Sequence, residues 1–268
     1  MRYWFDGQWF EQDVIQLPIA EPGLLYGATI FTTLRVYDHN LFHPLTHWPA
    51  HGDRLRQTLA ELGWPFPDWS GLTQAAQRLG QEYPVLRITL FPAGQGWIVG
   101  RSLPPDLDQR QRQGIAAWLM PPGRFQRSLA DWKTGNYLAP WLAQQTAQRQ
   151  QSQEAILTNN QGHWLETSTG NLWGWRDDIF FTPTFTGEQL AGIAHHHVSQ
   201  WIEQQGGIVR DEVWTSTLVK SLQGVAYSNS VVEIIPIHTI HIDASDHLYF
   251  PSAQAPQYHR LADYFRTA

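Results

Sequence analysis

Lys133 and Glu166 are the two residues whose types and spacing most clearly indicate a catalytic site. The chain has only two lysines, Lys133 and Lys220. Lys133 stands just before a run with helical character, predicted over 137–151. Two short apolar segments joined by Asn-Asn-Gln-Gly then predict a hairpin over 154–165, and Glu166 follows it directly. Such a hairpin can return Glu166 to the start of the helix, beside Lys133.

A lysine amine beside a buried carboxylate is the equipment that pyridoxal phosphate requires. The amine condenses with the cofactor aldehyde, the carboxylate partners the pyridinium nitrogen, and small donors hold the phosphate. Thr167, Ser168 and Thr169 supply such donors next to Glu166. The same spacing also fits a surface lysine ahead of an ordinary helix and a glutamate ending an ordinary strand. The residues by themselves leave both interpretations open.

Histidine-rich segments offer no convincing metal site. His43, His47 and His51 are spaced by four residues, as metal ligands on a helix can be. Prolines interrupt this segment, however, and make one regular helix through all three histidines unfavourable. In the triplet 195–197, successive helical residues point about 100° apart and cannot converge on one ion. We therefore expect no metal.

Composition excludes several other classes. The formal net charge of −6 argues against non-specific nucleic-acid binding, which needs clustered basic residues. The absence of cysteine excludes disulfides, thiolate metal sites and cysteine nucleophiles. No apolar segment reaches the roughly 20 residues of a membrane span, and residues 1–10 lack the apolar region of a signal peptide. We expect a soluble, cytoplasmic protein with no membrane partner.

Two sequence segments resemble a known signature. K-T-G-N-Y-L at 133–138 and L-E-T-S-T-G-N-L-W at 165–173 are similar to the signature of the class IV aminotransferases. These are fold-type IV pyridoxal-phosphate enzymes, and they include branched-chain and D-amino-acid aminotransferases and 4-amino-4-deoxychorismate lyase. The resemblance runs from Trp4 to about Pro236, with its pieces in the family's order.

The resemblance implies an α+β or α/β fold of two domains, each a sheet or barrel with packed helices, like that of D-amino-acid aminotransferase. A length of 268 residues allows two cores. We place an N-terminal domain at 1–118 and the cofactor domain at 124–268. The linker is placed at 119–123, where two prolines favour an extended connection.

The resemblance also assigns cofactor contacts. Arg54, in H-x-x-R-L, matches the family arginine that binds the phosphate, although a solvated helix arginine would look the same. A glycine-ended turn leading into a helix offers free N–H groups to the phosphate after Gly192. The implied cofactor-binding residues are Arg54, Lys133, Tyr137, Glu166, Leu190, Ile193, Ala194 and Ser230.

Substrate contacts follow less directly. Tyr26 matches the family tyrosine that faces the cofactor, and Asn229 matches an asparagine found in some lyase members. Thr32 stands where many transaminases carry glutamate, and we assign it a catalytic role, although a strand residue chosen for propensity would fit as well. Many relatives carry a carboxylate-binding arginine after the strand at 86–91. Here none follows before Arg101.

Three functions remain open. F-T-T at 31–33 and Ser-Asn-Ser at 228–230 favour a 4-amino-4-deoxychorismate lyase, which releases pyruvate and 4-aminobenzoate for folate synthesis. The alternative is an aminotransferase acting on branched-chain or D-amino acids. A catalytically silent binding protein is the third, and retention of both Lys133 and Glu166 argues against it. The family implies a small amino-acid-like substrate and a homodimer.

Overall fold

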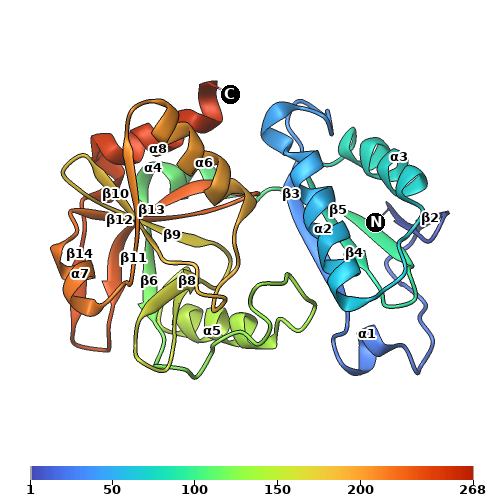
Figure 1. Cartoon of the computed structure of the whole chain (residues 1–268), viewed down its shortest axis with the longest axis horizontal. Coiled ribbons are helices and arrows are strands. Elements are labelled where there is room, and N and C mark those ends of the chain that lie inside the picture. The colour runs from blue at the N-terminus through green and yellow to red at the C-terminus, as the bar shows by residue number, and fades with distance from the viewer. Residues whose placement is uncertain (1, 268) are drawn as a thin grey trace. The chain divides into compact units, whose positions relative to one another are not determined.

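The computed structural model describes residues 2–267, and its internal contacts divide the chain into two compact α+β units (Figure 1). Unit 1 is Met1–Pro104 with Trp132–Asn136, and unit 2 is Pro105–Asp131 with Tyr137–Ala268. The chain therefore first changes unit between two consecutive prolines. The linker predicted at 119–123 instead begins at the last residue of β6 (Ile115–Leu119), a strand paired on both sides within unit 2. That predicted boundary is wrong, because a strand in a sheet interior cannot serve as a linker.

Unit 1 is one antiparallel sheet with helices on one face. The strand order is β2-β1-β5-β4-β3, and each neighbouring pair is antiparallel. The strands are β1 (Arg2–Phe5), β2 (Gln8–Glu11), β3 (Ile30–Arg35), β4 (Val85–Leu90) and β5 (Gly96–Arg101). The helices are α1 (Pro22–Leu25), η1 (Pro44–Thr46), α2 (Trp48–Leu62) and α3 (Trp69–Gly80).

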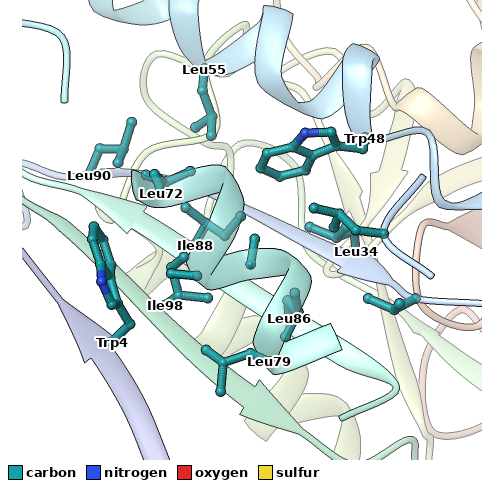
Figure 2. Close-up of a cluster of buried hydrophobic side chains, with 14 of the residues drawn as sticks. Trp4, Leu34, Trp48, Leu55, Leu72, Leu79, Leu86, Ile88, Leu90 and Ile98 are labelled. Atoms are coloured by element: carbon teal, nitrogen blue, oxygen red, sulfur yellow. The ribbon is translucent and has the colours of Figure 1, made fainter. Parts of the chain in front are cut away.

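The core of unit 1 lies between this sheet and its two long helices. Apolar residues of α2 and α3 recur at helical spacing and form one stripe on each helix. Figure 2 shows Trp48 and Leu55 of α2 with Leu72 and Leu79 of α3, gathered over the inward residues of the strands. The strand residues labelled there are Trp4, Leu34, Leu86, Ile88, Leu90 and Ile98.

Unit 2 is built on a larger mixed sheet in the order β11-β10-β9-β12-β13-β6-β7-β8, with β14 paired to β13. Pairs β10–β11, β13–β6 and β6–β7 are parallel, and the other pairs are antiparallel. The remaining strands are β7 (Glu154–Thr158), β8 (Trp164–Thr167), β9 (Asn171–Arg176), β10 (Ile179–Pro183), β11 (Ile208–Glu212), β12 (Gly224–Asn229), β13 (Glu233–His241) and β14 (His247–Tyr249).

Helices pack on this sheet and contribute to its core. Figure 1 shows α4, α6 and α8 grouped together, while α5 packs against β7. Trp164, Trp173, Trp175 and Trp214 are all fully buried in unit 2, which accounts for part of the tryptophan-rich composition. The helices are α4 (Leu107–Gln113), α5 (Leu138–Arg149), α6 (Ile193–Gln204), α7 (Ser216–Ser221), η2 (Ser252–Gln254) and α8 (Pro256–Thr267).

The hairpin predicted ahead of Glu166 is confirmed as β7 and β8, which pair antiparallel. Its turn is fixed by Asn159, whose side-chain oxygen accepts from the backbone N–H groups of Gln161 and His163 at 3.1 and 2.9 Å. Gly162 adopts φ +77°, which a residue with a side chain rarely does. The Asn-Asn-Gln-Gly sequence therefore determines this turn locally. Within residues 2–267, no helix is both long and apolar enough to cross a membrane.

Candidate functional site

Glu166 is a buried carboxylate held from both sides. It lies in β8, and its Oε1 accepts from Arg127 Nη1 at 3.1 Å. Both side chains are nearly inaccessible, at 4% for Arg127 and 6% for Glu166. Oε2 accepts the backbone N–H of Leu190 at 3.3 Å. A guanidinium and an amide together fix the carboxylate as an anion with a defined orientation. Sequence reasoning missed Arg127 entirely.

The loop from Leu190 to Gly192 connects this carboxylate to a helix N-terminus. Asn171 Nδ2 donates to the Leu190 carbonyl at 2.7 Å, and a Cβ atom at position 192 would overlap Asn171 Oδ1. Only glycine fits there. Gly192 caps α6 without a side-chain hydrogen bond, so the first N–H groups of the helix, including those of Ile193 and Ala194, have no intrahelical partner. Such amides suit an anion.

Tyr137 contacts the loop that follows Glu166 and lies near Arg127. Its hydroxyl donates to the Ser168 carbonyl at 2.8 Å, and the Arg127 guanidinium lies 5.8 Å from its ring centroid. Unit 2 thus brings Tyr137, Glu166 and Leu190 together through one set of contacts around Arg127 and the loop after β8.

The three hydroxyl residues after Glu166 do not serve as phosphate donors. Ser168 and Thr169 donate their hydroxyls to the buried carboxylate of Glu154, and Thr167 donates to the Gly170 carbonyl at 3.1 Å. That sequence-based interpretation is wrong, because these hydroxyls are already used to brace the loop that follows Glu166.

Asn229 is the last residue of β12 and lies near this loop. The Asn229 side chain donates to the Thr169 carbonyl at 3.2 Å and accepts from the N–H groups of Val231 and Val232, each at 2.9 Å. These bonds give Asn229 a clear structural role in the β12–β13 turn. Ser230 follows directly as a half-buried turn residue.

Lys133 belongs to unit 1, not to the C-terminal domain in which the sequence placed it. Its carbonyl accepts from Phe31 N at 2.8 Å, and Gly135 N donates to the Thr29 carbonyl at 2.6 Å. A Cβ at position 135 would overlap the Thr29 hydroxyl, so the glycine of K-T-G allows this pairing. The physical reason for the correction is that residues 132–136 extend the edge of β3.

Arg87 is a second residue that sequence reasoning missed. Its guanidinium carbon lies 3.6 Å from the centroid of the Phe31 ring, and the Lys133 Nζ atom lies 4.9 Å from the same centroid. The two cations therefore gather around one ring. The family pattern points to an arginine after the strand, whereas Arg87 lies within β4 and pairs with Thr33 of β3. The alternation of apolar and polar residues along β4 could have indicated that Arg87 points away from the core.

Thr32 and Arg54 are joined in unit 1. The Thr32 hydroxyl lies 2.5 Å from His51 Nδ1 and accepts from Arg54 Nη2 at 2.8 Å. Thr32 and His51 are both fully buried. The geometry favours a positioning role for Thr32 towards Arg54 over the catalytic role expected from the sequence. Tyr26, by contrast, is 76% exposed after α1.

Across residues 2–267, no three His, Asp or Glu side chains are grouped so that they could hold a metal ion. His51 is hydrogen-bonded to Thr32.

His195, unlike the exposed His196, is buried. The centroid of its ring lies 4.6 Å from that of Trp173 and 5.1 Å from that of Phe185, and burial lowers its pKa to about 4.

This histidine should make the protein acid-sensitive. The folded chain binds a proton at His195 only near pH 4, whereas the unfolded chain binds it below about pH 6.5. The contribution of His195 to the free energy of unfolding is therefore fully present above pH 6.5. It is lost as the pH drops towards 4, by up to about 3 kcal/mol. His195→Gln should flatten the pH dependence of the unfolding free energy in that window, and the exposed His196→Gln should not. Equal slopes in wild type and His195→Gln would contradict the assignment.

Residues 29–240 match the family model described as Amino-transferase class IV. The chain is 25% identical over 240 residues to aminodeoxychorismate lyase of Vibrio harveyi, covering 84% of this chain and 87% of that protein. It is 23% identical over 261 residues to the branched-chain-amino-acid aminotransferase of Salmonella typhimurium, covering 88% and 84%.

Solved structures share the fold. The branched-chain amino acid aminotransferase of Escherichia coli superposes with a TM-score of 0.83 at 21% identity, over 99% of this chain and 93% of that one. A hypothetical aminotransferase from Mycobacterium tuberculosis in a PLP-bound form gives 0.84 at 19% identity, over 99% and 98%. The two-unit architecture predicted from the sequence is thereby confirmed.

Proposed function

We propose that this chain, which belongs to the class IV aminotransferase family, is a 4-amino-4-deoxychorismate lyase. Such an enzyme releases pyruvate and 4-aminobenzoate for folate synthesis. Pyridoxal phosphate is the cofactor of this family and of this chain. The residues present fit it. Glu166 is a fixed buried anion for the pyridinium nitrogen, and the uncapped amides of Ile193 and Ala194 suit the phosphate.

The bound cofactor supplies an electron-withdrawing ring that stabilises negative charge at the α-carbon of the substrate. The chain's own residues do the rest. Lys133 anchors the cofactor and then moves the proton of that α-carbon. Arg54 and Ser230 contribute to holding the phosphate, the Leu190 N–H helps to orient Glu166, and Tyr137, bonded to the Ser168 carbonyl, contributes to the cofactor site. Arg87, beside Lys133 at the Phe31 ring, is our candidate for binding the substrate carboxylate.

The observation that carries the lyase proposal is Phe31-Thr32-Thr33. Many transaminases resembling this chain have glutamate at the position of Thr32, and here that position is a buried hydroxyl bonded to Arg54 and His51. The similarity to the Vibrio harveyi lyase supports the same assignment.

A paired assay tests the lyase proposal. Purified enzyme given 4-amino-4-deoxychorismate should release 4-aminobenzoate and pyruvate in equal amounts, without any 2-oxo acid. Formation of glutamate from 2-oxoglutarate and an amino donor, with no 4-aminobenzoate, would overturn the lyase assignment and leave the family intact.

An aminotransferase acting on branched-chain or D-amino acids is the second candidate. It is favoured by the similarity to the Salmonella typhimurium branched-chain enzyme and, at 24% identity over 259 residues, to D-alanine aminotransferase of Bacillus licheniformis. An arginine near Lys133 suits the carboxylate of any such amino acid. The glutamate arm of the assay detects this activity.

Substitutions of Thr32 can distinguish a role in positioning Arg54 from a direct role in catalysis. Thr32→Val keeps the shape but removes the hydroxyl that accepts from Arg54, so the affinity for pyridoxal phosphate should fall about tenfold. Thr32→Ser should retain it. The dissociation constant, measured by absorbance titration, is the readout. If Thr32→Val binds the cofactor normally but loses turnover, the catalytic role is correct instead.

We also propose a homodimer and a cytoplasmic location. Leu138, Trp141 and Leu142 form an exposed apolar stripe on α5, with exposed fractions of 61%, 52% and 40%. Three large apolar side chains on one helical face suit a protein interface. Sedimentation should give a dimer, and Trp141→Glu should weaken it. A monomeric wild type at micromolar concentration would rule the dimer out.

A further inference from the structure

Glu188 lies in the loop between β10 and α6, and its carboxylate accepts hydrogen bonds from three side chains. Oε1 accepts from Gln126 Nε2 at 2.9 Å. Oε2 accepts from Asn159 Nδ2 at 3.1 Å and from the Thr186 hydroxyl at 3.2 Å. Among residues 2–267, Glu188 forms no ion pair. Its charge therefore strengthens three bonds from neutral donors and is not used to hold a cation.

Glu188 connects the two segments that supply the partners of Glu166. Gln126 directly precedes Arg127, which pairs with Glu166 Oε1. Glu188 itself stands two residues before Leu190, whose N–H donates to Glu166 Oε2. The hydrogen bond between Gln126 and Glu188 therefore links the two groups that hold this buried carboxylate from opposite sides.

The two segments have no regular backbone structure to hold them together. Residues 121–131 and 184–192 form neither helix nor strand, so their relative position depends on side-chain contacts. Asn159 adds a third segment, because its Oδ1 is used in the turn of the β7–β8 hairpin and its Nδ2 donates to Glu188. Since β8 carries Glu166, the Glu188 side chain joins all three segments that surround the Glu166 carboxylate.

We propose that Glu188 is a positioning residue, which holds Arg127 and Leu190 at the spacing that directs the Glu166 carboxylate at the ring nitrogen of pyridoxal phosphate. It acts through these residues and is not itself assigned a contact with the cofactor. A group that orients a reacting ring needs such support, because a small displacement weakens its interaction. The inference rests on the role proposed for Glu166, but not on the choice between lyase and aminotransferase.

Glu188→Gln tests the positioning role with a change that keeps the shape of the side chain. Its new NH₂ group faces the NH₂ group of either Gln126 or Asn159, so at least one hydrogen bond is lost and no cation is left unpaired. The dissociation constant of pyridoxal phosphate should rise about fivefold. In the full-length chain before cofactor is added, the Leu190 N–H should exchange with solvent about tenfold faster, as measured by NMR.

A reciprocal variant restores the lost bond. In Gln126→Glu/Glu188→Gln, the amide at position 188 donates to the new carboxylate, and its oxygen still accepts from Asn159 and Thr186. Cofactor affinity and exchange rate should return to wild-type values, whereas Glu203→Gln, an exposed residue of α6, should change neither. Wild-type values in Glu188→Gln, or no recovery in the reciprocal variant, would overturn the proposal.

Glu166→Gln distinguishes failure of this inference from failure of the cofactor assignment. It should move the pH midpoint of the cofactor absorption band upwards, because a ring that is less firmly protonated withdraws fewer electrons. Glu188→Gln should move that midpoint in the same direction by a smaller amount. A shift in Glu166→Gln with none in Glu188→Gln refutes the positioning role alone. No shift in Glu166→Gln refutes the role of Glu166, and the positioning role with it.

Discussion

Lys133→Ala is expected to abolish turnover, by about 10⁴-fold or more, and to remove the absorption of the covalently held cofactor. The amine of Lys133 both anchors pyridoxal phosphate and moves the α-proton, and loss of a general acid–base group alone costs about 10² to 10⁴ in rate. The backbone of Lys133 is held by Phe31 of β3, and that of Gly135 by Thr29 just before β3, so shortening the Lys133 side chain to a methyl group should leave unit 1 folded. The measurement is an absorption spectrum with turnover on the same sample.

Lys220 provides a control that few enzymes offer. It is the only other lysine of the chain, and it is exposed on α7, which belongs to unit 2. Lys220→Ala should keep spectrum and activity. Borohydride reduction of the wild type followed by peptide mapping should attach the cofactor to the peptide containing Lys133. Attachment at Lys220, or an unchanged spectrum in Lys133→Ala, would contradict the assignment. A normal spectrum with no turnover on any amino donor would favour the silent binding protein.

The sequence near Lys133 predicted the neighbouring helix and hairpin, but it did not predict that Lys133 belongs to unit 1. The Asn-Asn-Gln-Gly turn determines the β7–β8 hairpin through contacts within five residues, so the hairpin was predictable. The pairing of Thr134 with Ile30 joins segments about a hundred positions apart. Nothing in the lysine's own neighbourhood encodes that partner. The same reason explains the misplaced linker, because β6 is recognisable as interior only once β7 and β13 lie beside it.

Candidate site residues divide in the same way. Gly192 and the start of α6 follow a local glycine-to-helix pattern, and the structure shows uncapped amides there. Thr167, Ser168 and Thr169 looked available because the sequence does not show that Glu154 lies beneath them. Arg127 could not be chosen among the many arginines, since its role depends on a carboxylate that only the folded sheet brings to it. Which arginine pairs with a buried glutamate therefore depends on tertiary structure and is not visible in the local sequence.

Arg127→Met should destabilise the protein by about 3–5 kcal/mol, since it leaves the buried Glu166 carboxylate without its cation. Leu190 N–H remains as a partner at 3.3 Å, which is not enough to replace a guanidinium. Urea unfolding of the apoprotein measures the loss without any contribution from the cofactor. Arg56→Met is the matched control, because Arg56 forms an exposed ion pair with Asp53 and its removal should cost under about 1 kcal/mol.

The double variant Arg127→Met/Glu166→Leu separates charge burial from packing. Replacing both partners by apolar groups removes the uncompensated carboxylate, so most of the stability lost in Arg127→Met should return. Activity should not return, because no anion remains to keep the pyridinium nitrogen protonated. A double variant as unstable as Arg127→Met would show that Arg127 acts through packing against Tyr137 and not through Glu166. An Arg127→Met protein within about 1 kcal/mol of wild type would show that the ion pair is not what holds this carboxylate in place.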